Sequence, residues 1–387
     1  MGCSCSTSSG GRRCSHTPRA LGGTKSTAQS LLTDKNAVHS AHKRHGKMMK
    51  VLITGTEQTG KTTVSKAMKI ALSGGLTKEE MDPIRSQIHA NLLQIMQTSV
   101  AYMEELKMSF ADSSLTGRCK NLQEEVVGPT GHLDSTVFNL IEDLWKDSQV
   151  KECFEKVRTA HQFISDGAEY LLTNIQRYRA EKFDLTDSDI LNVHLFHTDI
   201  SELYFTFWKY EYAMYDFSSH SPLNEILFSK FNNVEFVVFC ASLADYDVED
   251  EESSDAVGSS TDEASSPSPR TTNRMHKSLE LFDRFCQSSF IQNTFVWLIL
   301  NKKDLFRHKL IHTPLTVCFP DYKGKRTDAP AACNYIKQKF RSLHPRRNDL
   351  FVYVMCATDV SGLPKFKKAF ERASECRSLD DYGLLAS

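Results

Sequence analysis

One short segment has the residue types and the spacing of a phosphate-binding loop. Residues 55–62 are Gly-Thr-Glu-Gln-Thr-Gly-Lys-Thr, which fits the pattern G-x-x-x-x-G-K-[ST]. In such a loop, backbone N–H groups and the N-terminus of the following helix bind phosphate oxygens. We expect Lys61 to reach the β- and γ-phosphates and the hydroxyl of Thr62 to ligate Mg²⁺. The context suits the motif, because a β-rich run precedes the loop and a helical pattern follows it.

A second motif indicates which base is bound. Asn301-Lys302-Lys303-Asp304 directly follows an apolar run. The carboxylate of Asp304 can accept two N–H groups from the edge of guanine, a pattern that adenine does not offer. The tetrapeptide alone is a weak signal, because Lys-rich turns after strands are common. At the carboxyl end of a strand, in a chain with a phosphate-binding loop, it predicts a guanine nucleotide site.

The elements that must position these motifs alternate between strands and helices. This alternation predicts a doubly wound α/β domain. Between residues 75 and 184 almost every periodic segment is helical, so we expect an all-helical domain inserted into the α/β domain, which then comprises residues 49–74 and 185–387. The predicted strands are residues 49–54, 201–208, 210–215, 235–241, 295–300 and 351–356, and the predicted helices include 61–71, 84–108, 136–145, 150–178, 275–287 and 331–343.

Residues 1–48 are an N-terminal appendage with a weak amphipathic pattern at most. The chain begins Met-Gly-Cys-Ser-Cys-Ser, which fits M-G-x-x-x-[ST]. This pattern predicts myristoylation of Gly2, with Cys3 and Cys5 available for palmitate. Because one acyl chain gives only marginal membrane binding, a second anchor beside the first is physically sensible. The alternative is an unmodified tail.

Residues 245–270 form a second unusual segment. It is acidic and then Ser/Pro-rich, with no Lys or Arg from 245 to 269. Such a composition cannot bury enough apolar surface to fold, so we predict a disordered surface loop. Its Ser-Pro steps are either phosphorylation sites or parts of a solvated spacer.

Composition excludes several other classes of protein. The chain has 387 residues and a formal net charge of -1, which removes any global electrostatic case for binding nucleic acid. Its apolar runs are too short to span a bilayer, and it does not open with a secretory signal pattern. The 11 cysteines lack C-x-x-C spacing, so neither a disulfide framework nor a zinc site is indicated. A cytosolic protein of two domains is expected.

Taken together, the motifs resemble those of heterotrimeric G-protein α subunits, from Lys50 to Leu385. The run Cys356-Ala357-Thr358-Asp359 resembles the family's second base-contacting loop, and residues 381–385 resemble its receptor-facing tail. Further stretches that carry the resemblance are residues 61–70, Leu144-Trp145-Lys146-Asp147, Asn273-Arg274-Met275-His276, Leu281-Phe282-Asp283 and residues 301–306.

The resemblance implies a Ras-like P-loop GTPase domain with an inserted helical domain, binding GTP or GDP with Mg²⁺. It also implies a βγ dimer and a seven-helix receptor as partners, an effector that it does not identify, and a lipid-anchored place on the cytoplasmic face of the plasma membrane. The nucleotide-binding residues that it implies are Gly55, Glu57, Gln58, Thr59, Gly60, Lys61, Thr62, Thr63, Asp166, Gly167, Leu191, Asp216, Ser219, Asn301, Lys302, Asp304, Cys356, Ala357 and Thr358.

The two switch segments depart from the family pattern. In switch I, His194 stands where the family has its arginine finger, and His197 stands at the Mg²⁺-binding threonine, with Thr198 one residue later. In switch II, the family's D-V-G-G-Q is replaced by Asp-Phe-Ser-Ser-His at residues 216–220, so that His220 replaces the glutamine that orients water. The catalytic positions are therefore His194 and His220, and the metal ligands are Thr62 with Thr198 or His197.

The P-loop departs in a matching way, because Gln58 replaces the acid that pairs with the finger arginine. An arginine finger is worth about 10³–10⁵ in rate, or roughly 4–7 kcal/mol of transition-state stabilisation. We therefore predict nucleotide binding without efficient hydrolysis. Two alternatives are a pseudo-GTPase scaffold that binds βγ or a receptor without switching, and a P-loop kinase or ATPase, against which the N-K-K-D loop argues.

Overall fold

The computed structural model describes most of the chain from residue 48 to residue 381. The lipidation candidates Gly2, Cys3 and Cys5 lie outside the described residues. So do His197, Thr198, Ser219, His220, the Ser/Pro-rich segment from residue 252 to 270 and the C-terminal tail after residue 381. The described ranges are 48–128, 130–160, 166–180, 182–195, 201–207, 210–216, 234–251, 271–288, 294–345 and 350–381.

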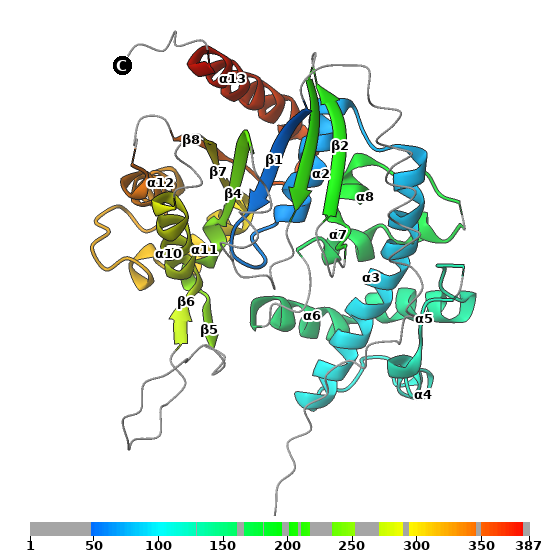
Figure 1. Ribbon diagram of the computed structural model, residues 1–387. Coiled ribbons are helices and arrows are strands. Elements are labelled where there is room, and N and C mark those ends of the chain that lie inside the picture. The colour runs from blue at the N-terminus through cyan, green and yellow to red at the C-terminus, as the bar shows by residue number, and fades with distance from the viewer. Residues whose placement is uncertain are drawn as a thin grey trace, which may run out of the picture. The chain divides into compact units, whose positions relative to one another are not determined.

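A six-stranded sheet forms the centre of the α/β domain (Figure 1). Its strand order is β2-β3-β1-β4-β7-β8, with β2 antiparallel to β3 and every other pair parallel. All six predicted strands are present, which confirms the predicted α/β class. Their bounds are β1 Met48–Thr54, β2 Ser201–Phe207, β3 Tyr210–Asp216, β4 Phe236–Ser242, β7 Phe295–Asn301 and β8 Phe351–Val354.

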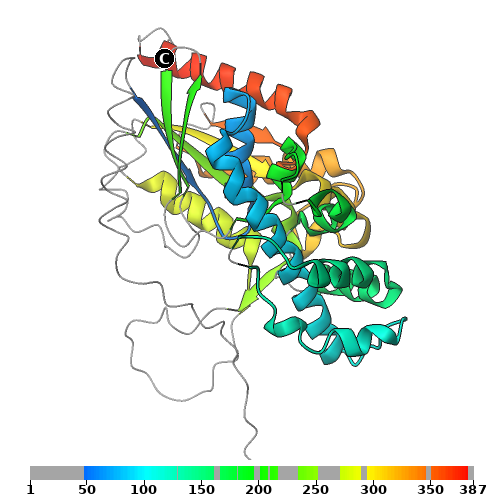
Figure 2. The same cartoon turned by 90° about the vertical axis from the view of Figure 1, so that its right-hand side faces the viewer.

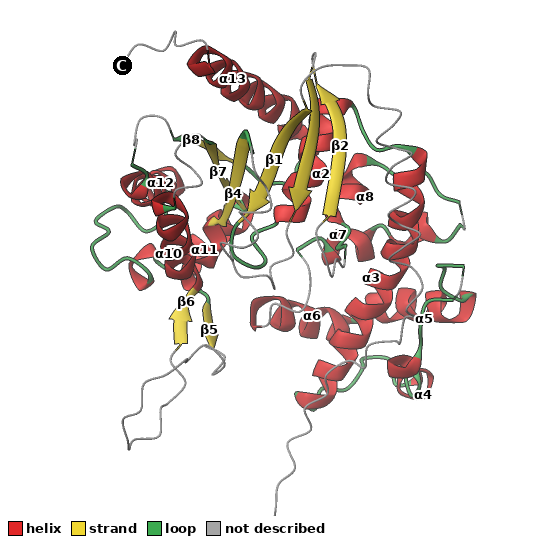
Figure 3. Ribbon diagram, viewed as in Figure 1, coloured by secondary structure: helices red, strands yellow, loops and turns green. Residues whose placement is uncertain are grey.

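Helices cover both faces of this sheet (Figure 3). Alternate residues of β1 show why: Val51 and Ile53 pack into one core with α2 and α13, whereas Leu52 packs into the other with α10, α11 and α12. Strands buried on both faces need continuous apolar runs, and all seven residues of β4 are buried. The helices are α2 Lys61–Ser73, α10 Arg274–Gln287, α11 Lys303–His312, α12 Ala329–Leu343 and α13 Leu363–Asp381.

The segment between α2 and β2 is helical, as predicted, and its cyan-to-green helices lie together in Figure 2. The long first helix opens with a capping box between Thr77 and Glu80. The single pattern predicted for residues 150–178 is instead divided between α6, α7 and a 3₁₀ turn. Bounds are α3 Lys78–Glu105, α4 Ser114–Arg118, α5 Ser135–Lys146, α6 Ser148–Ala160, α7 Ala168–Thr173 and α8 Asp187–Asn192.

The acidic segment corrects one prediction, because it does not begin as a loop at residue 245. A 3₁₀ helix, Leu243–Asp247, is followed by β5 Glu249–Glu251, which pairs with β6 Thr271–Asn273 in a two-stranded hairpin. Asp245 is buried and accepts a hydrogen bond from the hydroxyl of Ser242 at 2.7 Å. Composition alone misses this, because the partner of the carboxylate lies before the acidic run. Within the described residues, no helix has the length and apolar character needed to cross a bilayer.

Candidate nucleotide site

Three loops meet at the carboxyl ends of parallel strands. The phosphate-binding loop follows β1, the N-K-K-D loop follows β7 and the second base loop follows β8. In open α/β sheets, ligands bind at this edge of the sheet. The parallel pairing of β1 with β4, β4 with β7 and β7 with β8 brings the three loops to the same edge.

Two glycines in the phosphate-binding loop are required by its shape. Gly55 has φ of 140°, and a Cβ there would lie 2.1 Å from the carbonyl oxygen of Cys240. Gly60 has φ of 87°, and a Cβ there would lie 2.4 Å from the side-chain nitrogen of Asn301. Both positions combine a left-handed backbone with a close neighbour, so only glycine fits.

Lys61 lies inside the curve of this loop. Its ammonium donates to the carbonyl oxygens of Gly55 at 3.0 Å and Thr56 at 2.7 Å. Burial lowers the pKa of Lys61, and the negative charges of Asp216 and Glu57 act in the opposite direction. The hydroxyl of Thr59 also donates to Thr56, at 3.0 Å, which closes the loop on itself.

The residues described at the metal position suit Mg²⁺. Thr62 stands in the first turn of α2, and Asp216 ends β3 opposite Ile53, two residues before the phosphate-binding loop. Hydroxyl and carboxylate oxygens are the hard donors that Mg²⁺ prefers, and Mg²⁺ keeps water and phosphate oxygens as further ligands. Among the described residues, no three His, Cys, Asp or Glu side chains cluster to hold a metal by themselves. Thr62 and Asp216 would hold an ion that phosphate oxygens and water also ligate.

Asn301 joins the three loops. Its side-chain nitrogen donates to the carbonyl oxygen of Thr59 at 2.9 Å, and its side-chain oxygen accepts from the N–H of Ala357 at 2.9 Å. The side chain is 3% exposed, so both bonds are shielded from water. The first residue of the N-K-x-D motif therefore acts here as a structural tie between the phosphate and base loops.

Asp304 lies beside the second base loop. Burial raises the pKa of the Cys356 thiol to about 11, the hydroxyl of Thr358 opposes this, and the carboxylate of Asp304 adds to it. The sulfur of Cys356 lies 3.2 Å from the hydroxyl oxygen of Thr358. Asp304 itself is exposed. Its carboxylate therefore lies at the surface, next to Cys356 of the second base loop.

Lys302 connects the base loop to the helical domain. Its ammonium lies 2.8 Å from a carboxylate oxygen of Asp166. Burial would lower the pKa of Lys302, but Asp166 and Asp245 outweigh burial and raise it. The neighbouring Gly167 allows the backbone at this position to lie close to the end of α8, because a Cβ there would lie 2.0 Å from the carbonyl oxygen of Asn192.

Helix α8 is anchored by one buried carboxylate, that of Asp189. The guanidinium of Arg177 binds both of its oxygens at 2.9 Å, and the hydroxyls of Tyr178 and Tyr170 donate to it at 2.7 and 3.0 Å. Thr186 completes the set as the N-cap of the helix. Burial alone would raise the pKa of Asp189, but the hydrogen bonds from Arg177 and Tyr178 dominate and lower it. Leu191, on the same helix, is buried in the core.

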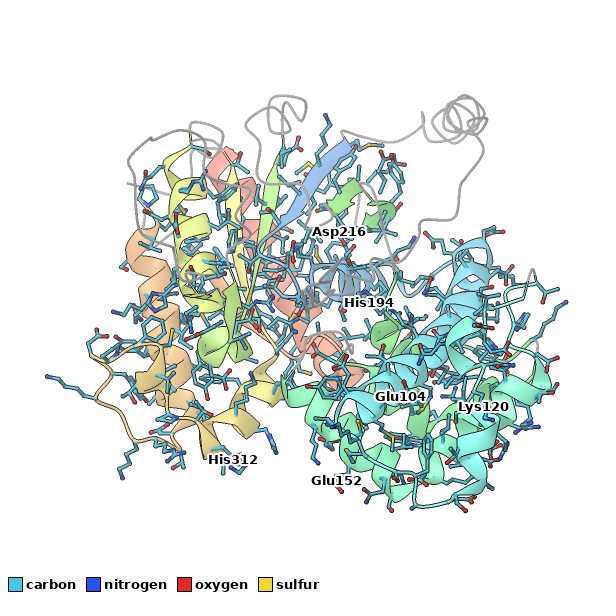
Figure 4. All side chains as sticks on the ribbon, turned by 90° about the horizontal axis from the view of Figure 1, so that it is seen from below. Glu104, Lys120, Glu152, His194, Asp216 and His312 are labelled. Atoms are coloured by element: carbon cyan, nitrogen blue, oxygen red, sulfur yellow. The ribbon has the colours of Figure 1, made fainter. Side chains whose placement is uncertain are left out.

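The backbone around His194 is held from two domains. Lys66 of α2 donates to the carbonyl oxygens of Ile190 at 2.6 Å and Val193 at 2.7 Å. Asn91 of α3 binds His194 twice, accepting from its N–H at 2.7 Å and donating to its carbonyl oxygen at 3.0 Å. Figure 4 labels the exposed His194 at the end of α8 and Asp216 at the end of β3. Burial lowers the pKa of Lys66 to about 7, and Asp216 opposes the shift.

Sequence reasoning missed Lys66 and Asn91, because their partners are backbone atoms more than a hundred residues away. Gln58 and Glu57 are exposed at the tip of the phosphate-binding loop, and Thr63 lies in the first turn of α2. Among the predicted residues, the structure brings together Thr59, Asn301 and Ala357, and also Lys302 and Asp166. Lys61 contacts Gly55, and Cys356 contacts Thr358.

Fold and site together define an α/β nucleotide-binding protein of the P-loop class. The family model of the G-protein alpha subunits matches residues 25–372. The chain therefore belongs to this family, and its fold is a Ras-like GTPase domain with a helical domain. It is a guanine nucleotide-binding alpha subunit of the family that carries out signal transduction. Members generally bind GTP or GDP with Mg²⁺, partner with βγ dimers and receptors, and associate peripherally with membranes.

Proposed function

We propose that this chain couples a seven-helix receptor to an intracellular effector and that it binds GTP and GDP but hydrolyses GTP weakly. The observation that carries the nucleotide-binding part is Asn301, which ties the phosphate loop to the second base loop through two buried hydrogen bonds. Lys61 and Thr62 then serve the phosphates and Mg²⁺, and Asp304 serves the base.

The weak hydrolysis follows from the residue at the finger position. The backbone of His194 is fixed by Asn91 and by Lys66, which bonds the residue before it. An imidazole placed there is shorter than a guanidinium and lacks both its fork and its permanent positive charge. Losing a finger arginine removes roughly 4–7 kcal/mol of transition-state stabilisation. Nucleotide affinity depends on other residues and is less affected.

Binding and turnover are tested separately. Binding of GTPγS and GDP, each with and without Mg²⁺, is measured first. Single-turnover release of phosphate then compares the parent with His194→Arg, Gln58→Glu, His220→Gln and the triple variant at equal occupancy. The triple variant should exceed the sum of the singles, because these groups act as a unit. A parent that hydrolyses GTP as fast as ordinary α subunits would refute weak hydrolysis.

One observation favours a second candidate, a pseudo-GTPase scaffold that binds βγ or a receptor without switching. Glu57 adds a carboxylate to the tip of the phosphate-binding loop, close enough to Lys61 to act on its ammonium. The same carboxylate would repel nucleotide phosphates. If neither GDP nor GTPγS binds the parent while βγ still does, the scaffold replaces the switch.

Base specificity has its own test. In Asp304→Asn, an amide donor takes the place of one carboxylate acceptor, which should shift preference from guanine to xanthine nucleotides. Competition of GDP, XDP and ADP for the parent and the variant measures the shift. Equal affinity of the parent for guanine and adenine nucleotides would show that Asp304 does not read the base.

Membrane attachment is proposed to depend on the acylation pattern at the N-terminus. Gly2→Ala should release most of the protein to the soluble fraction, because stable anchoring needs two signals. The double variant Cys3→Ser, Cys5→Ser should leave only marginal binding. If that double variant fractionates with membranes as tightly as the parent does, palmitoylation is not the second anchor.

A further inference from the structure

Arg274, the first residue of α10, reaches the tip of the phosphate-binding loop. One terminal nitrogen of its guanidinium donates to the carbonyl oxygen of Glu57 at 2.5 Å, and the other donates to the side-chain oxygen of Gln58 at 3.1 Å. The side chain is 4% exposed, and its Nε lies 3.8 Å from a carboxylate oxygen of Asp245. The buried guanidinium thus donates hydrogen bonds to two consecutive residues of the loop.

The position of this arginine needs a reason other than helix stability. A cation in the first turn of a helix faces the positive end of the helix dipole, which disfavours it. Asn273 already caps α10 by accepting from the N–H groups of Met275 and His276. The guanidinium is therefore not needed to begin the helix, and its contacts lie in the loop instead.

The hydrogen bond from Arg274 fixes the orientation of the peptide group between Glu57 and Gln58. In a trans peptide the C=O and the following N–H point in opposite directions. With the carbonyl of Glu57 bound to Arg274, the N–H of Gln58 points away from the arginine. Gln58 also has φ of 56°, a left-handed conformation that costs a non-glycine residue free energy unless its surroundings enforce it.

The charge of Arg274 also reaches the phosphate position. Burial is the main reason why the pKa of Lys61 is lowered, and Arg274 contributes in the same direction. The guanidinium and the Lys61 ammonium are therefore close enough for their charges to interact. Two cations from different elements, α10 and α2, then act on the same loop.

We propose that Arg274 is a positioning residue of the phosphate-binding loop, paired with Gln58, and that it presents the N–H of Gln58 to nucleotide phosphates. The proposal rests on the proposed nucleotide binding. Gln58 stands at the loop position where the resemblance implies an acid that binds the finger arginine, and His194 stands at the position of that arginine. In this chain Arg274 binds the loop position instead. The loop is thus held from α10 rather than from switch I.

A double-mutant cycle on Arg274 and Gln58 tests the pairing. Arg274→Lys keeps a positive charge but loses the fork, and Gln58→Ala removes the side-chain acceptor from an exposed loop tip. Dissociation of a fluorescent GDP analogue should become about tenfold to a hundredfold faster in Arg274→Lys, as expected for lost hydrogen bonds to a charged group. Gln58→Ala should accelerate dissociation less, and it should add almost nothing in the Arg274→Lys background.

Gln58→Glu supplies the matched control for charge. Its carboxylate repels phosphate in every background, but only the guanidinium fork of Arg274 can bind it through two parallel hydrogen bonds. Dissociation of the analogue should therefore be faster in the double variant with both Arg274→Lys and Gln58→Glu than in Gln58→Glu alone. The ratio of these two rates should exceed the acceleration that Arg274→Lys causes in the parent. Additive effects throughout would overturn the pairing.

The unliganded protein separates this proposal from nucleotide binding. If the parent binds no GDP, the proposed function fails, and the same four-variant cycle is read from thermal unfolding without nucleotide. Non-additive unfolding midpoints then support the Arg274–Gln58 pair, and additive midpoints overturn it. Full-length protein is used in each case.

Discussion

Asn301→Asp is the sharpest test of how the loops are joined. The change is isosteric, and one oxygen of the new carboxylate still accepts from the N–H of Ala357. The other oxygen replaces the donor that faced the carbonyl oxygen of Thr59 at 2.9 Å. Leaving that carbonyl without its donor costs about 1–3 kcal/mol, or roughly fivefold to 150-fold in the dissociation constant of a nucleotide.

The loss should depend on pH in a stated direction. Position 301 is buried, so the pKa of a carboxyl introduced there is raised. Below that pKa the protonated carboxyl can donate to Thr59 again, and affinity should recover as the pH falls from about 8 to about 5.5. Equilibrium titration with a fluorescent GDP analogue, for parent and variant over this range, measures both effects.

The same experiment shows whether Asn301 acts by joining the loops or by contacting the base. Asn301→Asp should weaken guanine and xanthine nucleotides by equal factors, because the damage is to loop geometry. Asp304→Asn should instead change the ratio of the two. If Asn301→Asp binds GDP as tightly as the parent at pH 8, the two hydrogen bonds do not couple the loops to the nucleotide and the reasoning is wrong.

Three further predictions concern stability. Burial, with a smaller effect of His132, lowers the pKa of His89 from 6.5 to about 4. The free energy of unfolding should therefore decrease by about 3 kcal/mol as the pH falls from 6.5 to 4. His89→Leu should flatten the change of unfolding temperature between about pH 7.5 and about pH 5. Gly167→Ala should lower the unfolding temperature, because its Cβ would meet the Asn192 carbonyl at 2.0 Å; an unchanged midpoint contradicts the close approach. Asp189→Asn should cost about 3 kcal/mol or more by chemical denaturation, because a buried carboxylate that binds Arg177 is lost; Asp187→Asn on the same helix is the control.

The strands and the three loops were predictable because their signals are local. The apolar run of residues 295–300 needs no distant partner to indicate a strand buried on both faces. The glycines of the phosphate-binding loop lie where the backbone requires them, at Gly55 and Gly60. Each loop motif directly follows the strand that its neighbouring apolar run predicts, and the structure places the loops at the ends of these strands.

The contacts of Arg274, Lys66 and Asn91 were not predictable in this way. Each side chain binds backbone atoms far along the chain, and any residue type supplies such atoms, so nothing in the sequence marks the partner. The error at residue 245 has a related cause. Composition describes an average over the acidic run, whereas Asp245 is buried, accepts a hydrogen bond from the hydroxyl of Ser242 and lies near the guanidinium of Arg274.

The hairpin of β5 and β6 makes this alpha subunit suitable for carrying a grafted reporter. Glu251 pairs with Thr271, so the two residues that flank positions 252–270 are direct neighbours. Each doubling in length of a loop closed in this way costs only about 0.6 kcal/mol. A fluorescent domain whose own ends lie close together can therefore replace residues 252–270. The strand that follows the reporter, β6, runs directly into Arg274, so that only the three residues of β6 separate the reporter from a contact with the phosphate-binding loop.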